Sequence, residues 1–557
     1  MQKSGLASLA IFYHDFRDDQ MKDRRGLLSS VLVQLCHQSD SYCAILSKLY
    51  SEHANGSQHP SDHALVCCFN NMVNLPQQAP IFLIVDALDE CPNTYTLPSP
   101  REEVLLLIKD LVDSQLPNLR ICITSRPEAD ITQVLAPLTF RSTSLHDERG
   151  HMEDIKHFIT SIVHTDSAMR RWRPDHKQTV IDVLTNRADG VYVTNILIPL
   201  GSDQSPCGRF RWVYCQLDSL RQSFPQSILH ALDELPETLN DTYERNLHEV
   251  RKTYLEFARR LLLCVSVAYR PLRVDELAEL LAIDFEAGPI PKRREDWLWE
   301  DPLEALWSTC PALLSFVNAE GSIVVQFPHF SVMEFLTSSH LGKHDTALSR
   351  YRISVISGHI LVAQVCFGIL LQVDENVTRD NLTRFPLAEY AAEHWIEHTR
   401  FQGVLQAAEG GMKQLFDPDK PHFAIWLWIH DPIRISYERA ERPSPPLKTP
   451  LHYAAFLGLH SIVKFLVLEH SQDVNSPGVD DGSTPLHLAS QNGCAEVVRF
   501  LVEHGASTDS QDRDGSTPLH RASETGLTDL SQILVEHGGD VTAPGQVWID
   551  SAASSVA

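Results

Sequence analysis

Two groups of polar side chains, each directly after an apolar run, could together hold a metal ion and a phosphate group. They are Asp86, Asp89 and Glu90 after "IFLIV", and Ser125 and Arg126 after "LRICIT". A carboxylate at the end of a buried strand can hold Mg²⁺, and one a turn further along can orient an attacking water. An arginine at the same place can neutralise a γ-phosphate. These residue types therefore suit a nucleoside triphosphate, with Asp86 as the metal ligand and Asp89 and Glu90 as the catalytic residues.

A structural role is the alternative for the same side chains. Asp86 and Asp89 could cap turns, and Arg126 could form an ion pair with one of them. Each residue taken singly favours that structural role, and only the whole string of residues is specific.

Three apolar segments must position these groups. Residues 6–13 ("LASLAIFY"), 81–86 and 119–125 predict strands that are buried on both faces. Between the last two, Ser99, Pro100 and Glu102 form the start of a helix that runs to about Ser114, with a capping box. Apolar strands that alternate with helices predict a parallel sheet covered on both sides. Ligands bind such sheets at the carboxyl ends of the strands, where both polar groups lie.

The string "IFLIVDALDE" followed by "ICITSRPE" resembles the NACHT family of signalling NTPases, which occur in innate immunity and in fungal incompatibility. The resemblance covers residues 1–135 and continues into the helical segments beyond. It implies that Asp86, Asp89 and Glu90 belong to the extended Walker B motif, and that Thr124, Ser125 and Arg126 belong to the sensor strand and contact the nucleotide. ATP or ADP with Mg²⁺ is the cofactor that the resemblance implies.

The glycine-rich loop that grips the phosphates in such proteins is missing from the sequence. The pattern G-x-x-x-x-G-K-[ST] does not occur, and the one Gly-Lys pair, Gly342-Lys343, precedes His344. In the family this loop directly precedes the strand at residues 6–13, so we expect the chain to begin just downstream of it. Since the loop amides and lysine cradle the phosphates, we expect this chain to bind nucleotide weakly or not at all and to be inactive. The full-length form would be at most a slow regulatory NTPase.

Residues 136–240 predict a helical domain with an insert at 191–208 ("VYVTNILIPLGSDQSPCG"). The insert has no helical period. It is either a surface loop or a translated intron, and sequencing of the mature transcript would distinguish the two.

Residues 241–345 predict a winged helix. We expect helices at 241–267, 274–283 and 302–308, a hairpin in "LLSFVNAEGSIVVQF" and a closing helix in "FSVMEFLTSSHL". Because the third helix carries Glu304 and no basic residue, we expect no DNA binding. "FPHFSVMEFL" resembles the NACHT-associated winged helix, which implies that His329 contacts the diphosphate of ADP. The alternative is that His329 only caps the helix that follows it.

Three repeats follow at 449–483, 484–516 and 517–547, each starting with Thr-Pro-Leu-His. They resemble ankyrin repeats. Threonine caps the first helix, proline occupies its first turn, and Gly458, Gly493 and Gly526 end it. We expect protein partners to bind the first helices and the aspartate-rich turns, at Tyr453, Phe456, Leu488, Gln491, Arg521 and Glu524. Residues 346–445 predict a helical spacer or degenerate repeats.

Composition limits the remaining choices. A formal net charge of −25 argues against nucleic acids and anionic membranes as partners. The twelve cysteines lack C-x-x-C pairs, so free thiols are expected. No apolar run approaches the roughly 20 residues that span a bilayer and no leader pattern appears, so a cytoplasmic location is expected. The predicted fold is multidomain: a partial α/β P-loop NTPase-like domain, a helical domain, a winged helix and an all-α ankyrin solenoid. The resemblance to the NACHT family implies that intact relatives act as nucleotide-gated switches and that the full-length form can make homo-oligomers. The alternative is an interaction scaffold with a non-functional NTPase remnant.

Overall fold

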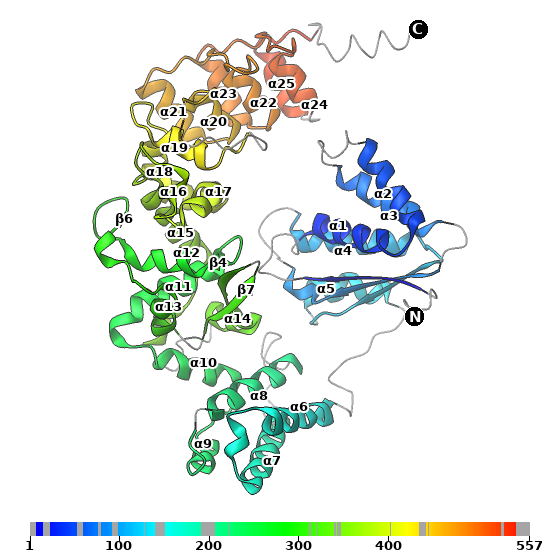
Figure 1. Cartoon of the computed structure of the whole chain (residues 1–557). Coiled ribbons are helices and arrows are strands. Elements are labelled where there is room, and N and C mark those ends of the chain that lie inside the picture. The colour runs from blue at the N-terminus through cyan, green and yellow to red at the C-terminus, as the bar shows by residue number, and fades with distance from the viewer. Residues whose placement is uncertain are drawn as a thin grey trace.

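The computed structural model describes most of the chain. The described residues are 7–14, 23–52, 60–75, 79–91, 98–126, 128–139, 151–190, 206–221, 223–310, 313–319, 321–338, 341, 347–401, 403–433, 442–443, 445–524 and 528–541. Two hydrophobic cores organise them. One belongs to the N-terminal α/β domain, and the other runs without interruption from the helices after residue 150 to the last ankyrin repeat. Figure 1 shows the blue α/β domain beside a column formed by the other elements.

The N-terminal domain is built on a small parallel sheet, as predicted. Its strands are β1 (Ser8–Tyr13), β2 (Ile81–Asp86) and β3 (Leu119–Ile123), in the order β1-β2-β3. The register pairs Ser8 with Ile81 and Ile81 with Leu119, so the three strands end at one edge. Helix α4 (Pro100–Asp113) begins with the predicted capping box between Ser99 and Glu102. It carries the chain from β2 to β3.

The prediction that both faces of the sheet are covered is wrong for the described residues. Burial alternates along β2: Ile81, Leu83 and Val85 are buried, whereas Phe82 between them is 37% exposed. The buried face packs against α1 (Arg24–Cys36), α3 (Asp62–Val73) and α4. The strands are apolar on both faces, and apolar sequence alone does not say which face receives a helix.

Two glutamines protect the outer edge of β1. Gln34 Oε1 accepts from Ile11 N at 2.9 Å and Gln34 Nε2 donates to Ile11 O at 2.7 Å. Gln38, just after the end of α1, makes the same pair of bonds to Leu9 at 2.9 and 2.6 Å. An unpaired strand edge attracts other strands. The helix α1 thus satisfies this edge with side chains in place of a neighbouring strand.

A helical domain follows the α/β domain. It contains α6 (His151–Thr165), α7 (Pro174–Gly190), α8 (Pro206–Arg221) and α9 (Ile228–Asp233). Trp212 on α8 is buried and donates to Pro236 O at 3.1 Å. Residues 191–205 of the predicted insert lie outside the described residues, and its last three residues belong to α8.

The winged helix has the predicted elements with one correction. Its helices are α10 (Leu239–His248), α11 (Leu255–Val267), α12 (Val274–Glu279), α13 (Pro302–Thr309) and α14 (Phe330–Thr337), and its wing is β7 (Ser315–Ala319) with β8 (Ser322–Gln326). The single helix expected at 241–267 is broken, with the 3₁₀ turn Lys252–Tyr254 before α11. No proline or glycine causes the break. It lets α10 pack against α8 while α11 packs against the next domain.

The spacer joins the winged helix to the repeats. It consists of α15 (Val355–Leu370), α16 (Arg379–Leu382), α17 (Ala388–Thr399), α18 (Val404–Leu415) and α19 (His422–Ile429). Its last part packs on the first repeat. The hydroxyl of Tyr453 donates to the carboxylate of Asp431 at 3.0 and 2.9 Å, and the rings of Tyr453 and Phe423 lie 5.4 Å apart.

The repeats form three helix pairs. They are α20 (Pro450–Phe456) with α21 (His460–Lys464), α22 (Pro485–Gln491) with α23 (Ala495–Glu503), and α24 (Pro518–Glu524) with α25 (Thr528–Glu536). The histidine of each Thr-Pro-Leu-His start bonds its own threonine. In the first repeat, His452 Nε2 also lies 3.0 Å from Ser483 O of the next repeat. Gly458 and Gly493 have φ of +71° and +74°, as helix ends require, and Gly526 lies outside the described residues.

Candidate functional site

The ends of β2 and β3 bring Asp86 and Thr124 together. The Thr124 hydroxyl donates to Asp86 Oδ1 and accepts from Ala87 N at 3.0 Å. Leu88 N donates to Thr124 O at 3.1 Å, so the segment that follows β2 is bonded to the segment that follows β3. Ala87 has a left-handed φ of 53°, which turns the chain sharply after Asp86. One Asp86 oxygen is therefore held in a fixed direction at the edge where ligands of parallel sheets bind.

Asp89 and Arg126 form an ion pair. Arg126 N donates to Asp89 Oδ1 at 3.1 Å, and Arg126 Nε lies 3.2 Å from Asp89 Oδ2. Asp89 is buried, and Arg101 donates to its backbone oxygen at 2.6 Å. Pairing of Arg126 with an aspartate was the structural alternative for these residues. Both carboxylate oxygens of Asp89 contact Arg126. Glu90 lies beside Asp89 in the short helix Leu88–Glu90. Catalytic roles for Asp89 and Glu90 stay predictions.

Arg126 also reaches the winged helix. Its Nη1 lies 2.5 Å from Glu334 Oε1, and its guanidinium carbon lies 5.5 Å from the centre of the Phe330 ring. Ser125, the residue before it, is exposed and donates its hydroxyl to Arg126 O at 2.9 Å. Arg126 therefore joins two domains in this structure, and its contact with a phosphate stays a prediction.

His329 lies one residue before Phe330 and caps α14. Its Nδ1 accepts from Ser331 N at 3.1 Å and lies 2.7 Å from the Ser331 hydroxyl. That hydroxyl is 2.8 Å from the Tyr243 hydroxyl on α10. The capping role, which was the alternative for His329, is present. Contact of His329 with a diphosphate stays a prediction. His329 is next in sequence to Phe330, whose ring the Arg126 guanidinium contacts.

The described residues fit one half of a magnesium–nucleotide site. Asp86 and Thr124 supply a carboxylate and a hydroxyl at the strand ends, which are oxygen ligands of the kind that Mg²⁺ prefers. The chain offers no glycine-rich loop for the phosphates. The residues present therefore do not make a nucleotide site by themselves. Elsewhere, Asp417, Asp419 and His470 have ligand atoms within 4.8 Å of one another, but exposed acidic groups often gather without an ion.

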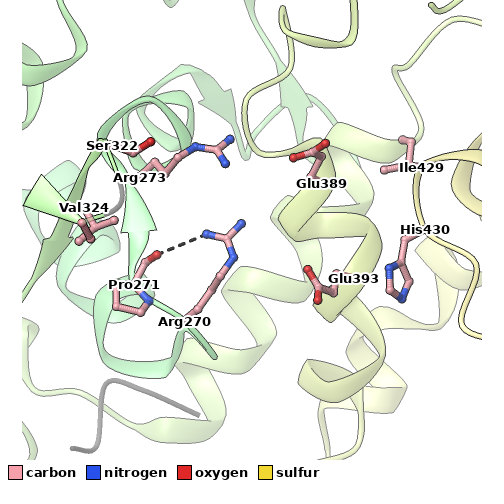
Figure 2. Close-up of a pocket in the computed structure, with 10 residues that line it drawn as sticks. Arg270, Pro271, Arg273, Ser322, Val324, Glu389, Glu393, Ile429 and His430 are labelled. Carbon is pink, nitrogen blue, oxygen red and sulfur yellow. Dashed lines mark hydrogen bonds between the residues drawn. The ribbon is translucent and has the colours of Figure 1, made fainter. Parts of the chain in front are cut away.

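A cavity of about 520 Å³ lies between the winged helix and the spacer. Figure 2 shows Arg270 and Arg273 on one wall, with Glu389 and Glu393 on the other. Arg270 forms a two-pronged bond to the buried Glu276 at 2.8 and 2.7 Å. Arg273 lies 3.2 Å from Glu276 and donates to Pro386 O of the spacer at 3.3 Å. Arg270 also lies over the ring of Tyr390 in the spacer, 5.1 Å from its centre, so both arginines contact the two domains.

A buried histidine pair lies at the same junction, and sequence reasoning missed it. His359 Nδ1 on α15 and His398 Nδ1 on α17 are 2.7 Å apart, and His398 Nε2 is 2.9 Å from the Tyr390 hydroxyl. The Tyr390 hydroxyl accepts from Tyr269 N at 3.2 Å. The bonds are all satisfied if Tyr390 donates to His398, and His398 donates to His359, with both rings neutral. Burial lowers the pKa of His359 to about 4 and lowers the pKa of His398 well below its usual range.

The surface of the repeats differs from the prediction. Tyr453 and Leu488 are buried, so they cannot meet a partner. Several of the aspartates are neutralised within the fold. Lys448 lies 2.5 Å from Asp480, and Arg521 lies 2.6 Å from Asp512. The exposed part of the turns and first helices includes Val479, Gln491 and Asp514.

Comparisons with known proteins agree with this architecture. Residues 1–126 match the family model "Nephrocystin 3, N-terminal", residues 245–349 match "GPI inositol-deacylase, winged helix domain" and residues 451–544 match "Ankyrin repeats (3 copies)". Fold and matches together describe a multidomain chain with an N-terminal α/β domain, a winged helix and ankyrin repeats. In this combination the chain is similar to fungal proteins of the NACHT and ankyrin-repeat type.

Two fungal relatives support that statement. "Azaphilone pigments biosynthesis cluster protein L" of Monascus ruber is 29% identical over 257 residues, which are 44% of this chain and 53% of the relative. "Vegetative incompatibility protein HET-E-1" of Podospora anserina is 22% identical over 420 residues, 70% of this chain and 28% of the relative. The chain spans about half the length of the first relative and little more than a quarter of the second. Among the described residues, none of the helices has the length and apolarity that crossing a bilayer demands.

Proposed function

We propose that this chain works as an interaction protein whose ankyrin repeats bind a protein partner while the α/β domain stays docked on the winged helix. The observation that carries the proposal is the position of Arg126. It pairs with Asp89 in its own domain and with Glu334 in the winged helix, so the side chain best suited to a γ-phosphate is used to join domains.

The partner would bind the exposed turns and first helices of the repeats. Val479 is an exposed apolar side chain at the tip of a turn, and Gln491 is exposed at the end of α22. Exposed Asp514 and Asp481 lie on the same series of turns. A partner with apolar and basic side chains fits this surface.

The test is to compare proteins that co-purify with the full chain and with single variants. Val479→Lys places a like charge against a basic partner and should remove the partner. Val535→Lys is the matched control, because Val535 is also an exposed valine but lies on the second helix of a repeat. Loss of the same partners in both variants, or in neither, would contradict binding at the turns.

The second candidate is a nucleotide-gated switch, in which the first domain is NTPase-like. The specific observation in its favour is the bond between Thr124 and Asp86 at the strand ends. In that case Asp86 would hold Mg²⁺, Thr124, Ser125 and Arg126 would meet the phosphates, and His329 would report on ADP. The phosphate-cradling loop would have to come from residues that this sequence does not contain.

A further inference from the structure

The outer face of the winged helix carries an aromatic surface that the rest of the chain does not cover in the described structure. Leu303 and Trp307 are four residues apart on α13 and therefore share one face of that helix. Trp307 is 57% exposed, and its ring stacks on Phe316 of the wing with centroids 5.6 Å apart and an angle of 27°.

The wing extends this surface. Phe316 pairs with Val325 across the hairpin, and Ile323 is two residues from Val325, so the three side chains point to the same side. Ile323 is 42% exposed. Leu303, Trp307, Phe316 and Ile323, here called the wing surface, form a strip from α13 to the hairpin. Large apolar side chains that gather at a surface commonly mark a binding site for another protein.

The segment that leads into α13 is exposed and acidic. Residues 294–301 are all exposed, and they include Trp297, Leu298 and Trp299. Residues 295–307 hold five carboxylates and no lysine, arginine or histidine. The two arginines just before them are engaged, Arg293 with buried Glu279 at 2.5 Å and Arg294 with Asp296 at 3.1 Å. The wing surface is therefore an apolar strip beside a row of negative charges.

We propose that the wing surface binds a protein segment that presents apolar side chains flanked by lysine or arginine, an amphipathic basic helix being the simplest form. Tryptophan and leucine supply the apolar anchor, and the carboxylates select a basic partner. Phosphates would be repelled by the same carboxylates, although this is the side with which winged helices often meet DNA. A second copy of the chain brings the same acidic row and a net charge of −25, which disfavours self-association there.

The test uses the full chain and two synthetic helical peptides of equal length, one of leucine and lysine and one of leucine and glutamate. Binding of each labelled peptide is followed by fluorescence anisotropy at about 0.15 M salt, where general attraction to a charged protein is screened. The lysine peptide should bind and the glutamate peptide should not. Trp307→Ala should weaken binding of the lysine peptide at least about tenfold, as loss of an aromatic anchor does.

Phe224→Ala is the matched control, since Phe224 is 70% exposed outside the wing surface, and this variant should bind as the wild type does. Glu304→Lys reverses a charge on α13 and keeps both Trp307 and Phe316, and it should weaken binding severalfold. If the Trp307→Ala variant fails to fold, the Glu304→Lys variant still tests the proposal.

Four outcomes would overturn the proposal: no binding of the lysine peptide, equal binding of both peptides, no loss in the Trp307 and Glu304 variants, or equal loss in Phe224→Ala. A dimer in light scattering that disappears in Trp307→Ala would show that a second copy occupies the surface. Binding of a DNA duplex that Glu304→Lys strengthens would show a nucleic-acid site instead.

Discussion

Arg126 lies between two carboxylates from different domains, with Nε 3.2 Å from Asp89 Oδ2 and Nη1 2.5 Å from Glu334 Oε1. The two contacts differ in environment. The Asp89 side chain is nearly buried, whereas the Glu334 side chain is 42% exposed. An ion pair with a buried carboxylate is costly to break, and a pair open to solvent contributes little. Removal of Arg126 should therefore be costly at the Asp89 contact, whereas loss of the Glu334 contact should cost little.

This difference predicts the order of two variants. Glu334→Ala should cost about 0.5–1 kcal/mol of docking free energy, because the pair is open to solvent. Arg126→Ala should lower the free energy of unfolding of the α/β domain by about 3 kcal/mol, because the Asp89 carboxylate stays buried without its cation. Amide hydrogen exchange in β3 and α14 measures both effects. Equal protection loss in the two variants would contradict the assignment.

We predict that this chain binds MgATP and MgADP no more tightly than about 100 μM, because no phosphate-cradling loop is present. Isothermal titration calorimetry measures the affinity. Asp86→Asn, which keeps the bond from Thr124, should then leave the titration unchanged. A low-micromolar dissociation constant that Asp86→Asn or His329→Ala weakens would support the switch in place of the scaffold.

The buried histidine pair predicts a loss of stability in acid. Burial holds the pKa of His359 near 4 and the pKa of His398 well below its usual value, so both are neutral in the folded protein. In the unfolded chain they bind protons below about pH 6.5. The unfolded state thus binds more protons between about pH 6.5 and 4, and the free energy of unfolding falls across that window by up to about 1.4 kcal/mol per pH unit for each histidine.

Urea unfolding at several pH values checks this prediction, with His359→Gln as the comparison. The glutamine does not titrate, so the pH slope of the variant should be smaller by up to one proton. Burial raises the pKa of the neighbouring Glu397. Protonation of Glu397 therefore stabilises the folded state as the pH falls, which offsets part of the loss that the histidines cause. The difference between wild type and variant removes that common contribution. An unchanged slope would mean that His359 is not a buried neutral group.

The contact of Tyr453 with the spacer predicts that the repeats depend on the helices before them. A fragment of residues 449–557 would expose the side of Tyr453 that packs on Phe423 and Trp426. It should not unfold cooperatively above about 60 °C, whereas a fragment of residues 346–557 should be markedly more stable. In the full chain, Tyr453→Phe removes only the bonds to Asp431 and should cost about 1–3 kcal/mol, since the acceptor is charged.

Local sequence determined many elements of this protein. The capping box of Ser99 and Glu102, the Thr-Pro-Leu-His starts of the repeats and the glycine turn of the wing all depend on residues a few positions apart. Their geometry is set by short-range hydrogen bonds and backbone preferences, so the sequence predicts them directly. The acid and polar ends of β2 and β3 follow as well, since parallel strands in one sheet must end at one edge.

Only the tertiary structure decided which partner each of these groups meets. Arg126 and Glu334 are 208 residues apart in the chain, and nothing near either residue indicates the other. The same holds for the His359–His398 pair, for the cover on one face of the sheet and for Trp307, whose apolar character alone would place it in the core. Burial and ion pairing depend on how whole domains pack against each other, and that packing is set by the sum of many distant contacts rather than by any short pattern.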